Sequence, residues 1–282
     1  MATNIHWFPG HMNKALNEIK EKIKLVDVII ELLDTRIPYS SFNDEFEKIV
    51  GNKKRLFVFT KADLADPEIT KGWVEQFKRE NKDFIFMDIL HDNVRQVLAP
   101  KINALAKEKH EKERSRGMKP QPVRAMIIGI PNVGKSSLIN KLAKRKVAGV
   151  ENRPGFTRGE QMIKIDNDFL LVDTPGVLPM NYENKKKAMH LALVGSIKEE
   201  ILPTLDMANY FLDFLKERYP HALENRFGIS EINENNQVLE EIAKKRGLLG
   251  QAGVLQIENA ASLLLKEFKD GKLLNISLER AL

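Results

Sequence analysis

The hydrophobic pattern of the chain changes near residue 180. Before it, short apolar runs rich in β-branched residues alternate with stretches whose apolar residues recur three or four positions apart. The first pattern is typical of buried strands and the second of amphipathic helices. The runs predict strands at residues 26–33, 55–59, 84–87, 124–128, 161–165 and 169–172. The other stretches predict helices at residues 13–25, 45–50, 67–80, 94–116 and 135–144.

This alternation predicts an α/β fold. Strands that alternate with helices form a mostly parallel sheet with helices on both faces, and the hairpin predicted at residues 161–172 adds one antiparallel edge. After residue 180 the strand signal fades, and the pattern predicts helices at residues 185–201, 204–218, 237–246 and 258–270. We therefore expect an α/β domain at residues 1–180 and a smaller all-α domain at residues 181–282.

Composition narrows the classes of protein that remain. Of the 282 residues, 43% are hydrophobic and 30% charged, as in an ordinary globular protein, and none is cysteine. The lack of cysteine excludes disulfides, thiolate nucleophiles and cysteine-bound zinc, and it fits a reducing compartment. No apolar run approaches the ~18 residues of a membrane helix, and the N-terminus does not resemble a secretion signal. We expect a cytoplasmic protein without a membrane partner.

Positive charge is concentrated in one part of the chain. Lysine and arginine together number 45 against 39 acidic residues, and residues 101–124 hold eight basic and three acidic residues. A basic patch of this kind favours a phosphate-rich partner. A solvated helix followed by a linker has the same composition, so the charge alone leaves both interpretations open.

The segment Gly129–Ser136 matches the pattern G-x-x-x-x-G-K-[ST] of a phosphate-binding loop, between a predicted strand and a predicted helix. Glycines let the backbone wrap around a phosphate with its N–H groups pointing inward, and the helix N-terminus adds a positive dipole end. We expect Lys135 to reach the β- and γ-phosphates and the Ser136 hydroxyl to bind Mg²⁺. The predicted nucleotide contacts in this loop are Asn132, Val133, Gly134, Lys135, Ser136 and Ser137.

Two elements behind this loop point to magnesium and the γ-phosphate. Asp173 follows the last predicted strand and opens the sequence D-T-P-G, in which the aspartate is expected to hold Mg²⁺ through water. The N–H group of Gly176 is placed to contact the γ-phosphate. Thr157 lies between the two motifs, and we expect it to complete the Mg²⁺ shell from a loop that orders around the γ-phosphate.

The residues expected to select the base precede the phosphate loop. Thr60, Lys61, Ala62 and Asp63 follow the strand predicted at residues 55–59. The Asp63 carboxylate can accept hydrogen bonds from the N1–H and 2-amino groups of guanine, donors that adenine lacks as a pair, while the Lys61 stem covers the base. The four residues resemble the N/T-K-x-D motif of translation-factor-class GTPases. Threonine has no amide to tie this motif to the phosphate loop, so we expect that tie to be lost.

The order of these motifs is unusual, because most small GTPases place the phosphate loop first and the guanine motif last. The chain therefore resembles a circularly permuted GTPase, whose sheet is intact and whose chain ends are displaced. The element that packs against the base should then fall at Asp88 and Ile89, where the family usually has Ser-Ala or similar residues. The C-terminal domain follows directly after the D-T-P-G turn, so its position could respond to the γ-phosphate.

The N-terminus narrows the resemblance. It reads I-H-W-F-P-G-H-M at residues 5–12, followed by Lys14 and Ala15, and D-T-R-I-P stands at residues 34–38. With the phosphate loop and R-P-G at residues 153–155, these motifs resemble the bacterial ribosome biogenesis GTPase A (YlqF) family over essentially the whole chain. The resemblance implies a GTPase that binds an immature large ribosomal subunit, is stimulated by it, and contacts ribosomal RNA through its C-terminal helices.

Catalysis needs a group that orients the attacking water, and Val177 stands where Ras-like enzymes have a glutamine for this purpose. The family resemblance points instead to His11. From the residues alone, His11 can also be the polar edge of an apolar anchor formed by Trp7, Phe8 and Pro9.

The expected cofactors are GTP or GDP and Mg²⁺, with K⁺ as a further candidate. Asn132 matches the position at which potassium-dependent GTPases coordinate K⁺ near the β- and γ-phosphates, where the ion would replace an arginine finger. An amide that only braces the loop is the alternative.

The function expected from these features is a monomeric GTPase that binds the immature large (50S) subunit and its 23S rRNA and promotes a late step of subunit maturation. Two other classes stay open. One is a nucleotide-gated RNA-binding scaffold whose hydrolysis is incidental. The other is a P-loop ATPase or small-molecule kinase, which the guanine motif disfavours.

Overall fold

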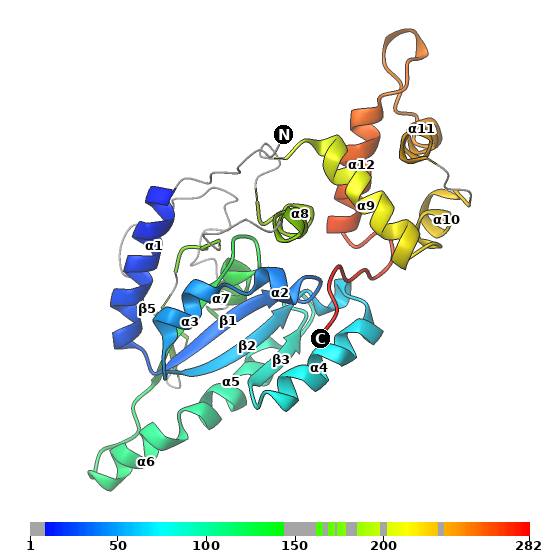
Figure 1. The fold of residues 1–282 in the computed structure, drawn as a ribbon. Helices are drawn as coiled ribbons and strands as arrows, with labels where there is room; N and C mark the ends of the chain where they lie inside the picture. The colour runs from blue at the N-terminus through cyan, green and yellow to red at the C-terminus, as the bar shows by residue number, and fades with distance from the viewer. Residues whose placement is uncertain are drawn as a thin grey trace.

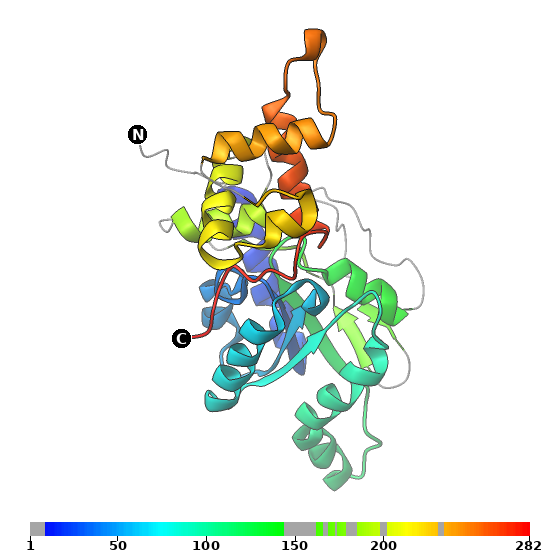
Figure 2. The same cartoon turned by 90° about the vertical axis from the view of Figure 1, so that its right-hand side faces the viewer.

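The computed structural model describes residues 9–143, 162–165, 169–172, 174–178, 185–197, 202–230 and 234–282. A six-stranded sheet has the order β3-β2-β1-β4-β6-β5, and a helical part stands beside it (Figures 1 and 2). The strands are β1 (Val28–Asp34), β2 (Lys54–Thr60), β3 (Asp83–Met87), β4 (Val123–Gly129), β5 (Met162–Lys164) and β6 (Phe169–Val172). Neighbouring strands pair in parallel except β5 and β6, which are antiparallel. The predicted fold class is confirmed.

Helices cover both faces of this sheet. The helices of this part of the chain are α1 (Pro9–Lys22), α2 (Pro38–Ser41), α3 (Asp44–Val50), α4 (Pro67–Arg79), α5 (Val94–Leu105), α6 (Lys107–Ser115) and α7 (Lys135–Ala143), with short 3₁₀ helices η1 (Ile23–Leu25) and η2 (Ala62–Leu64). Every residue of β1 is buried; Val28, Ile30 and Leu32 lie in one apolar cluster, and Ile29 and Leu33 lie in two others. The cluster on one face includes residues of α5 and α7, and the cluster on the other includes residues of α1 and α3.

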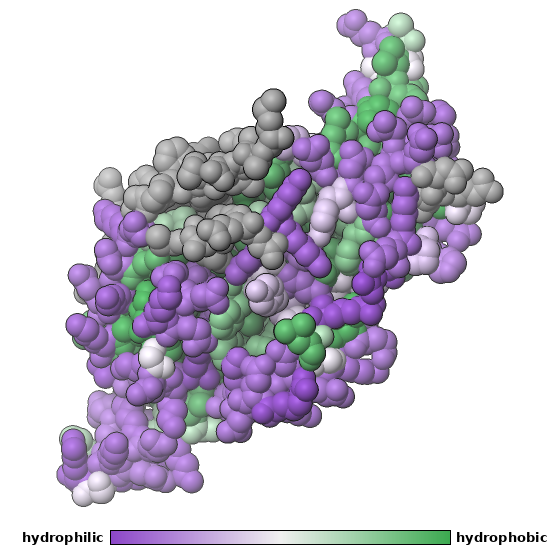
Figure 3. All heavy atoms as spheres, in the orientation of Figure 1, coloured by the Kyte–Doolittle hydropathy of each residue, from purple (hydrophilic) through white to green (hydrophobic). Residues whose placement is uncertain are grey.

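The single helix predicted at residues 94–116 is wrong in one respect, because it divides at Ala106. In α5 the side chains of Val94, Leu98 and Ile102 are buried in the core, and Ala106 ends this apolar stripe. No residue of α6 is buried. The chain therefore leaves the sheet at Ala106, and α6 projects from the molecule, where the surface is mostly hydrophilic (Figures 1 and 3).

The C-terminal part is helical, as predicted. Its helices are α8 (Lys185–Leu193), α9 (Thr204–Arg218), α10 (Ala222–Phe227), α11 (Asn235–Lys245) and α12 (Ile257–Lys269), together with the 3₁₀ helix η4 (Gln251–Gly253). Helix α8 is shorter than the 185–201 predicted, because turns follow it up to Ile197, and α10 was not predicted. The rings of Phe211 and Phe268 lie 4.6 Å apart between α9 and α12. Among the described residues, no helix is both long and apolar enough to span a membrane.

The last residues of the chain return from the helical part to the sheet. The N–H of Ile276 donates to the carbonyl of Leu64 at 3.2 Å, and the N–H of Leu278 donates to the carbonyl of Arg36 at 2.9 Å. The carbonyl of Leu282 accepts a hydrogen bond from Arg79 of α4 at 3.0 Å. The C-terminal segment therefore joins the helical part to the loops after β1 and β2 (Figure 1).

Candidate functional site

The phosphate-loop sequence connects β4 to α7 at the carboxyl edge of the sheet. The loop backbone adopts positive φ angles at Asn132 (+57°) and Gly134 (+108°). Alternation of this kind turns successive N–H groups toward one side and forms an anion-binding concavity. Because α7 begins at Lys135, the positive end of its dipole faces the same concavity.

The Lys135 ammonium lies inside this loop. Its Nζ donates to the carbonyls of Ile130 at 2.8 Å and Gly129 at 3.2 Å, and the residue is only 8% exposed. A Cβ atom added at Gly176 would lie 2.9 Å from Lys135 Nζ and 2.9 Å from the Pro131 nitrogen. A side chain at Gly176 would thus displace the lysine, and this glycine is required by a close approach of backbone to ammonium.

The chain that follows β6 is bound to β4 and the phosphate loop. The Thr174 hydroxyl donates to the carbonyl of Ile127 at 2.6 Å, and the N–H of Val177 donates to the carbonyl of Gly129 at 3.2 Å. The structure therefore brings the D-T-P-G turn to the phosphate loop, although Asp173 itself lies outside the described residues. Val177 is fully buried, so its side chain faces the core.

The guanine-motif residues reach the same place from β2. Thr60 is buried, and its hydroxyl lies 2.7 Å from the carbonyl of Val133 and 3.2 Å from that of Leu33. The amide tie is absent, as expected of threonine, but the Thr60 hydroxyl donates to a loop carbonyl and still joins this motif to the phosphate loop. Residues 60 and 133 are thereby joined across 73 positions of sequence.

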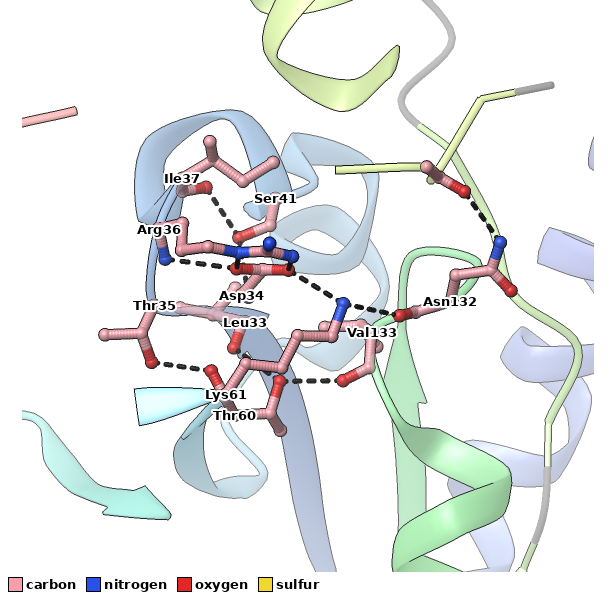
Figure 4. Close-up of polar contacts among 11 residues, drawn as sticks. Leu33, Asp34, Thr35, Arg36, Ile37, Ser41, Thr60, Lys61, Asn132 and Val133 are labelled. Atoms are coloured by element: carbon pink, nitrogen blue, oxygen red, sulfur yellow. Dashed lines mark hydrogen bonds and ion pairs between the residues drawn. The ribbon is translucent and has the colours of Figure 1, made fainter. Parts of the chain in front are cut away.

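Lys61 extends from the end of β2 across the phosphate loop (Figure 4). Its Nζ donates to the carbonyl of Asn132 and to Oδ2 of Asp34, both at 2.9 Å. Its backbone has a left-handed φ of +56°, which turns the chain sharply into η2. Burial lowers the pKa of Lys61, and the Asp34 carboxylate opposes this shift.

Asp63 lies on η2 with an exposed side chain. Partial desolvation and the nearby Asp88 carboxylate raise the pKa of Asp63 above its ordinary value. A ligand that donates hydrogen bonds to the Asp63 carboxylate would stabilise its charged form and oppose this shift.

Asp88 and Ile89 follow β3, and their side chains make different contacts. The Asp88 carboxylate accepts hydrogen bonds from the N–H groups of Leu90 at 2.8 Å and His91 at 3.3 Å, and it also contacts the His91 ring. Ile89 is buried, and its Cδ1 lies 3.0 Å from a Cβ position at Gly134. Ile89 therefore packs against the phosphate loop, whereas Asp88 shapes its own turn.

The Asn132 side chain faces the helical part. Its Nδ2 donates to the carbonyl of Gly195, just after α8, at 2.6 Å (Figure 4). The amide thus braces the loop against the residues after α8, and its oxygen is the atom with the chemistry to bind a cation.

Three of the remaining predicted site residues lie wholly or partly outside what the structure describes. Thr157 and Asp173 are outside the described residues, and His11 stands in the first turn of α1 with an undescribed side chain. Ala62, Ser136 and Ser137 occupy η2 and the first turn of α7, beside the residues above. Their predicted roles stay predictions.

Asp34 and Arg36, for which the sequence motifs predict no chemical role, also lie at this site. Both side chains are about 1% exposed, and they form a two-pronged ion pair of 2.8–3.0 Å. Burial alone would raise the pKa of Asp34, but the cations of Arg36 and Lys61 hold it well below its usual range. The available signal was a carboxylate at the end of a mostly apolar strand.

Comparison with known proteins agrees with this arrangement. A family model described as 50S ribosome-binding GTPase matches residues 124–248, which begin at β4 and leave the guanine motif upstream of the match. A solved structure of YlqF from Thermotoga maritima, described as bound to GNP, superposes with a TM-score of 0.67 and 30% identity, and covers 95% of this chain and 98% of that one.

Two relatives match almost the whole chain. Ribosome biogenesis GTPase A of Bacillus cereus is 41% identical over 276 residues, which cover 98% of this chain and 93% of the relative. Ribosome biogenesis GTPase A of Bacillus licheniformis is 40% identical over 277 residues, which cover 98% of each. These matches confirm the resemblance inferred from the sequence motifs, and the chain belongs to the ribosome biogenesis GTPase A family.

Proposed function

We propose that this protein binds and hydrolyses GTP, docks on an immature large (50S) ribosomal subunit and promotes a late step of its maturation. The observation that carries the proposal is the hydrogen bond from Thr60 to Val133, with Lys61 donating to Asn132 beside it. These contacts join a guanine-type motif to a phosphate loop, in a chain of this family.

The test is GTP turnover measured with and without purified large subunits, in K⁺ and in Na⁺. We expect slow turnover by the free protein and a large stimulation by the subunit. Turnover that the subunit leaves unchanged would contradict the assembly-GTPase proposal and favour a scaffold whose hydrolysis is incidental. Faster stimulated turnover in K⁺ than in Na⁺ would support a K⁺ ligand at Asn132, and equal rates would leave that residue as a loop brace.

We propose the following roles for the site residues from the motifs in which they stand. Asp63 accepts hydrogen bonds from the guanine edge, the Lys61 stem covers the base, and Ile89 supports the loop beneath it. The loop N–H groups and Lys135 bind the β- and γ-phosphates, together with the N–H of Gly176. His11 orients the attacking water.

Magnesium fits the proposed donor set. Ser136, Thr157 and Asp173 offer two hydroxyls and a carboxylate, and oxygen is the ligand type that Mg²⁺ prefers. When bound, the ion would neutralise charge on the phosphates. The described residues contribute Ser136 at the start of α7, next to Lys135.

We also propose that the domain boundary lies near residues 180 and 181, that the helical domain contacts 23S rRNA, and that the protein acts as a cytoplasmic monomer. The surface of the 101–124 stretch supports an RNA partner. Lys109 is paired with Asp27 at 3.1 Å, but Arg114, Arg116 and Lys119 have exposed side chains at the projecting end of α6 and just after it.

Replacing Asp63 with asparagine should shift preference from GTP toward xanthosine triphosphate. The change puts an N–H donor where the guanine amino group also donates, whereas xanthine presents a carbonyl there. We expect GTP affinity to fall by about a hundredfold, because a hydrogen bond to a charged group is lost and a donor is left facing a donor. Competition binding with the two nucleotides measures the shift.

The matched control for this variant is Glu68→Gln, which removes one negative charge from the nearby surface of α4. It should leave the ratio of the two affinities unchanged. Unaltered GTP preference in Asp63→Asn would remove Asp63 from the base site and reopen the ATP interpretation.

Binding to the large subunit should weaken steeply with salt, because lysine and arginine contacts release counterions from phosphates. Replacing Arg114, Arg116 and Lys119 with glutamine should flatten the log-affinity against log-salt plot by about one unit per lost phosphate contact. Titration at several KCl concentrations gives the slope.

The control replaces three exposed lysines on α3 and α4, namely Lys48, Lys71 and Lys78. Equal flattening in both triple variants would show that net charge sets the slope. No flattening in the first would identify the stretch as a solvated helix and linker.

A further inference from the structure

Asp34 is the last residue of β1 and one of the most enclosed charges among the described residues. Its Oδ1 accepts hydrogen bonds from the Arg36 backbone N–H at 3.1 Å and from Nε at 3.0 Å. Its Oδ2 accepts from Arg36 Nη2 at 2.8 Å and from Lys61 Nζ at 2.9 Å. A buried carboxylate persists only with such partners, and Asp34 has a cationic partner on each of its two oxygens.

The contact with Lys61 goes beyond what the β1 turn needs. Arg36 alone supplies a two-pronged ion pair and closes the turn, whereas Lys61 comes from the neighbouring strand. Lysine has a flexible four-carbon stem, and its ammonium is here held by two acceptors at once, Asp34 Oδ2 and the Asn132 carbonyl. Figure 4 shows the stem drawn out between the end of β2 and the phosphate loop.

The helical part of the molecule contacts Arg36, the ion-pair partner of Asp34. The Arg36 guanidinium lies 5.3 Å from the centroid of the Phe268 ring on α12, and the Arg36 carbonyl accepts the N–H of Leu278 at 2.9 Å. Arg36 of the ion pair therefore contacts the C-terminal segment, and Asp34 of the ion pair contacts Lys61 of the guanine motif.

We propose that Asp34 is a positioning residue for guanine nucleotide binding: its carboxylate holds the Lys61 ammonium at the Asn132 carbonyl and so places the Lys61 stem across the base site before the nucleotide arrives. The inference rests on the proposed function, because it takes a guanine nucleotide as the ligand. Asp34 acts through Lys61. The competing interpretation is a structural ion pair with Arg36, to which Lys61 adds nothing for binding.

The test is a double-mutant cycle on affinity for fluorescent (mant) GDP, with Asp34→Asn, Lys61→Met and the two combined. Methionine keeps an apolar stem of similar length and removes the ammonium. Asp34→Asn should weaken binding about tenfold when Lys61 is present, since a charge-assisted hydrogen bond is lost. It should change affinity less than about twofold when residue 61 is already methionine, because the two residues act as one unit.

Asp34→Asn leaves the Arg36 charge buried without a counterion, which destabilises the fold. The cycle is therefore repeated in a second background, in which the Arg36 charge is also removed. Asp34→Asn with Arg36→Met removes the pair together, a change that buried ion pairs often tolerate. In this background the nucleotide should again bind about tenfold more weakly, and adding Lys61→Met should have no further effect. The matched control is Asp27→Asn, which breaks ion pairs with Arg124 and Lys109 just before β1 and should leave GDP affinity unchanged.

A measurement on the unaltered protein is independent of every variant. In the nucleotide-free state, acetylation of Lys61 by acetic anhydride should be several-fold slower than that of the exposed Lys71, as followed by mass spectrometry. Equal reactivity would overturn the proposal, as would equal affinity losses from Asp34→Asn with and without Lys61. A wild-type protein that binds no GDP would instead overturn the proposed function. The cycle tests this first, because the affinity of the wild-type protein is measured before that of any variant.

Discussion

Replacing Lys135 with alanine should weaken binding of GDP and GTP by roughly a hundredfold or more, because we expect the ammonium to donate charge-assisted hydrogen bonds to the β-phosphate of both nucleotides and to the γ-phosphate of GTP. In the structure this ammonium lies within the phosphate loop and contacts the carbonyls of Gly129 and Ile130. Those carbonyls hold it at the place where a bound phosphate would meet it. Isothermal titration with GDP and Mg²⁺ measures the loss.

The loss has to be separated from damage to the fold. A ligand that binds only the folded state raises the melting temperature, so GDP should raise that of the wild-type protein and hardly that of Lys135→Ala. The matched control is Lys48→Ala, which removes an exposed lysine paired with Glu45 and should keep the GDP-induced rise. Wild-type affinity and turnover in the Lys135→Ala variant would show that this loop does not bind phosphates.

The strands were accessible from the sequence because their signals are local, whereas their order in the sheet was not predicted. β1 and β4 are mostly apolar runs, and their alternation with helices favours a parallel sheet. The N-cap of α4 is equally local: Asp66 precedes Pro67, and its carboxylate accepts the N–H groups of Glu68 and Ile69, as such a pair predicts. The positions of the motifs then follow, since each stands at the carboxyl end of a parallel strand.

The contacts that join the motifs were not accessible in the same way. The Thr60 hydroxyl contacts the Val133 carbonyl only after two strands and a loop have folded. The hydrophobic periodicity of the sequence does not predict a contact between residues 73 positions apart. Asp34 illustrates the same limit. An aspartate after an apolar strand predicts a turn or a ligand, whereas the structure shows it neutralised by Arg36 two positions away and by Lys61 from β2.

Errors in element length have a packing cause. The apolar spacing of α5 ends at Ala106, but the residues beyond it are good helix formers, so pattern and propensity favour one helix where packing makes two. Helix α8 is the reverse case. Its side chains from Ala188 to Leu193 are all buried, because it contacts both α2 and α9. A helix buried on all sides lacks the one-sided apolar stripe whose end marks the end of a surface helix.

His11 stands in the first turn of α1, a helix that packs against the residue following the D-T-P-G turn. Helix α1 is followed almost directly by β1 and runs antiparallel to it, so its N-terminal end points to the edge of the sheet that carries the phosphate loop (Figure 1). Leu16 and Ile19 of α1 share an apolar cluster with Val177. Val177 is fully buried and has no polar atom to orient water, so another group must do so.

His11→Ala should therefore keep GTP affinity and binding to the large subunit while subunit-stimulated turnover falls by about a hundredfold or more, the usual range for loss of a positioned proton acceptor. A neutral imidazole can accept a hydrogen bond from water, so no strong base is needed. His11→Gln should recover part of the rate, because an amide oxygen can orient water without taking its proton. Single-turnover hydrolysis on saturating subunits isolates this step. Weaker subunit binding at full stimulated turnover would make His11 the edge of an apolar anchor, and would move the search for the water-orienting group to the subunit itself.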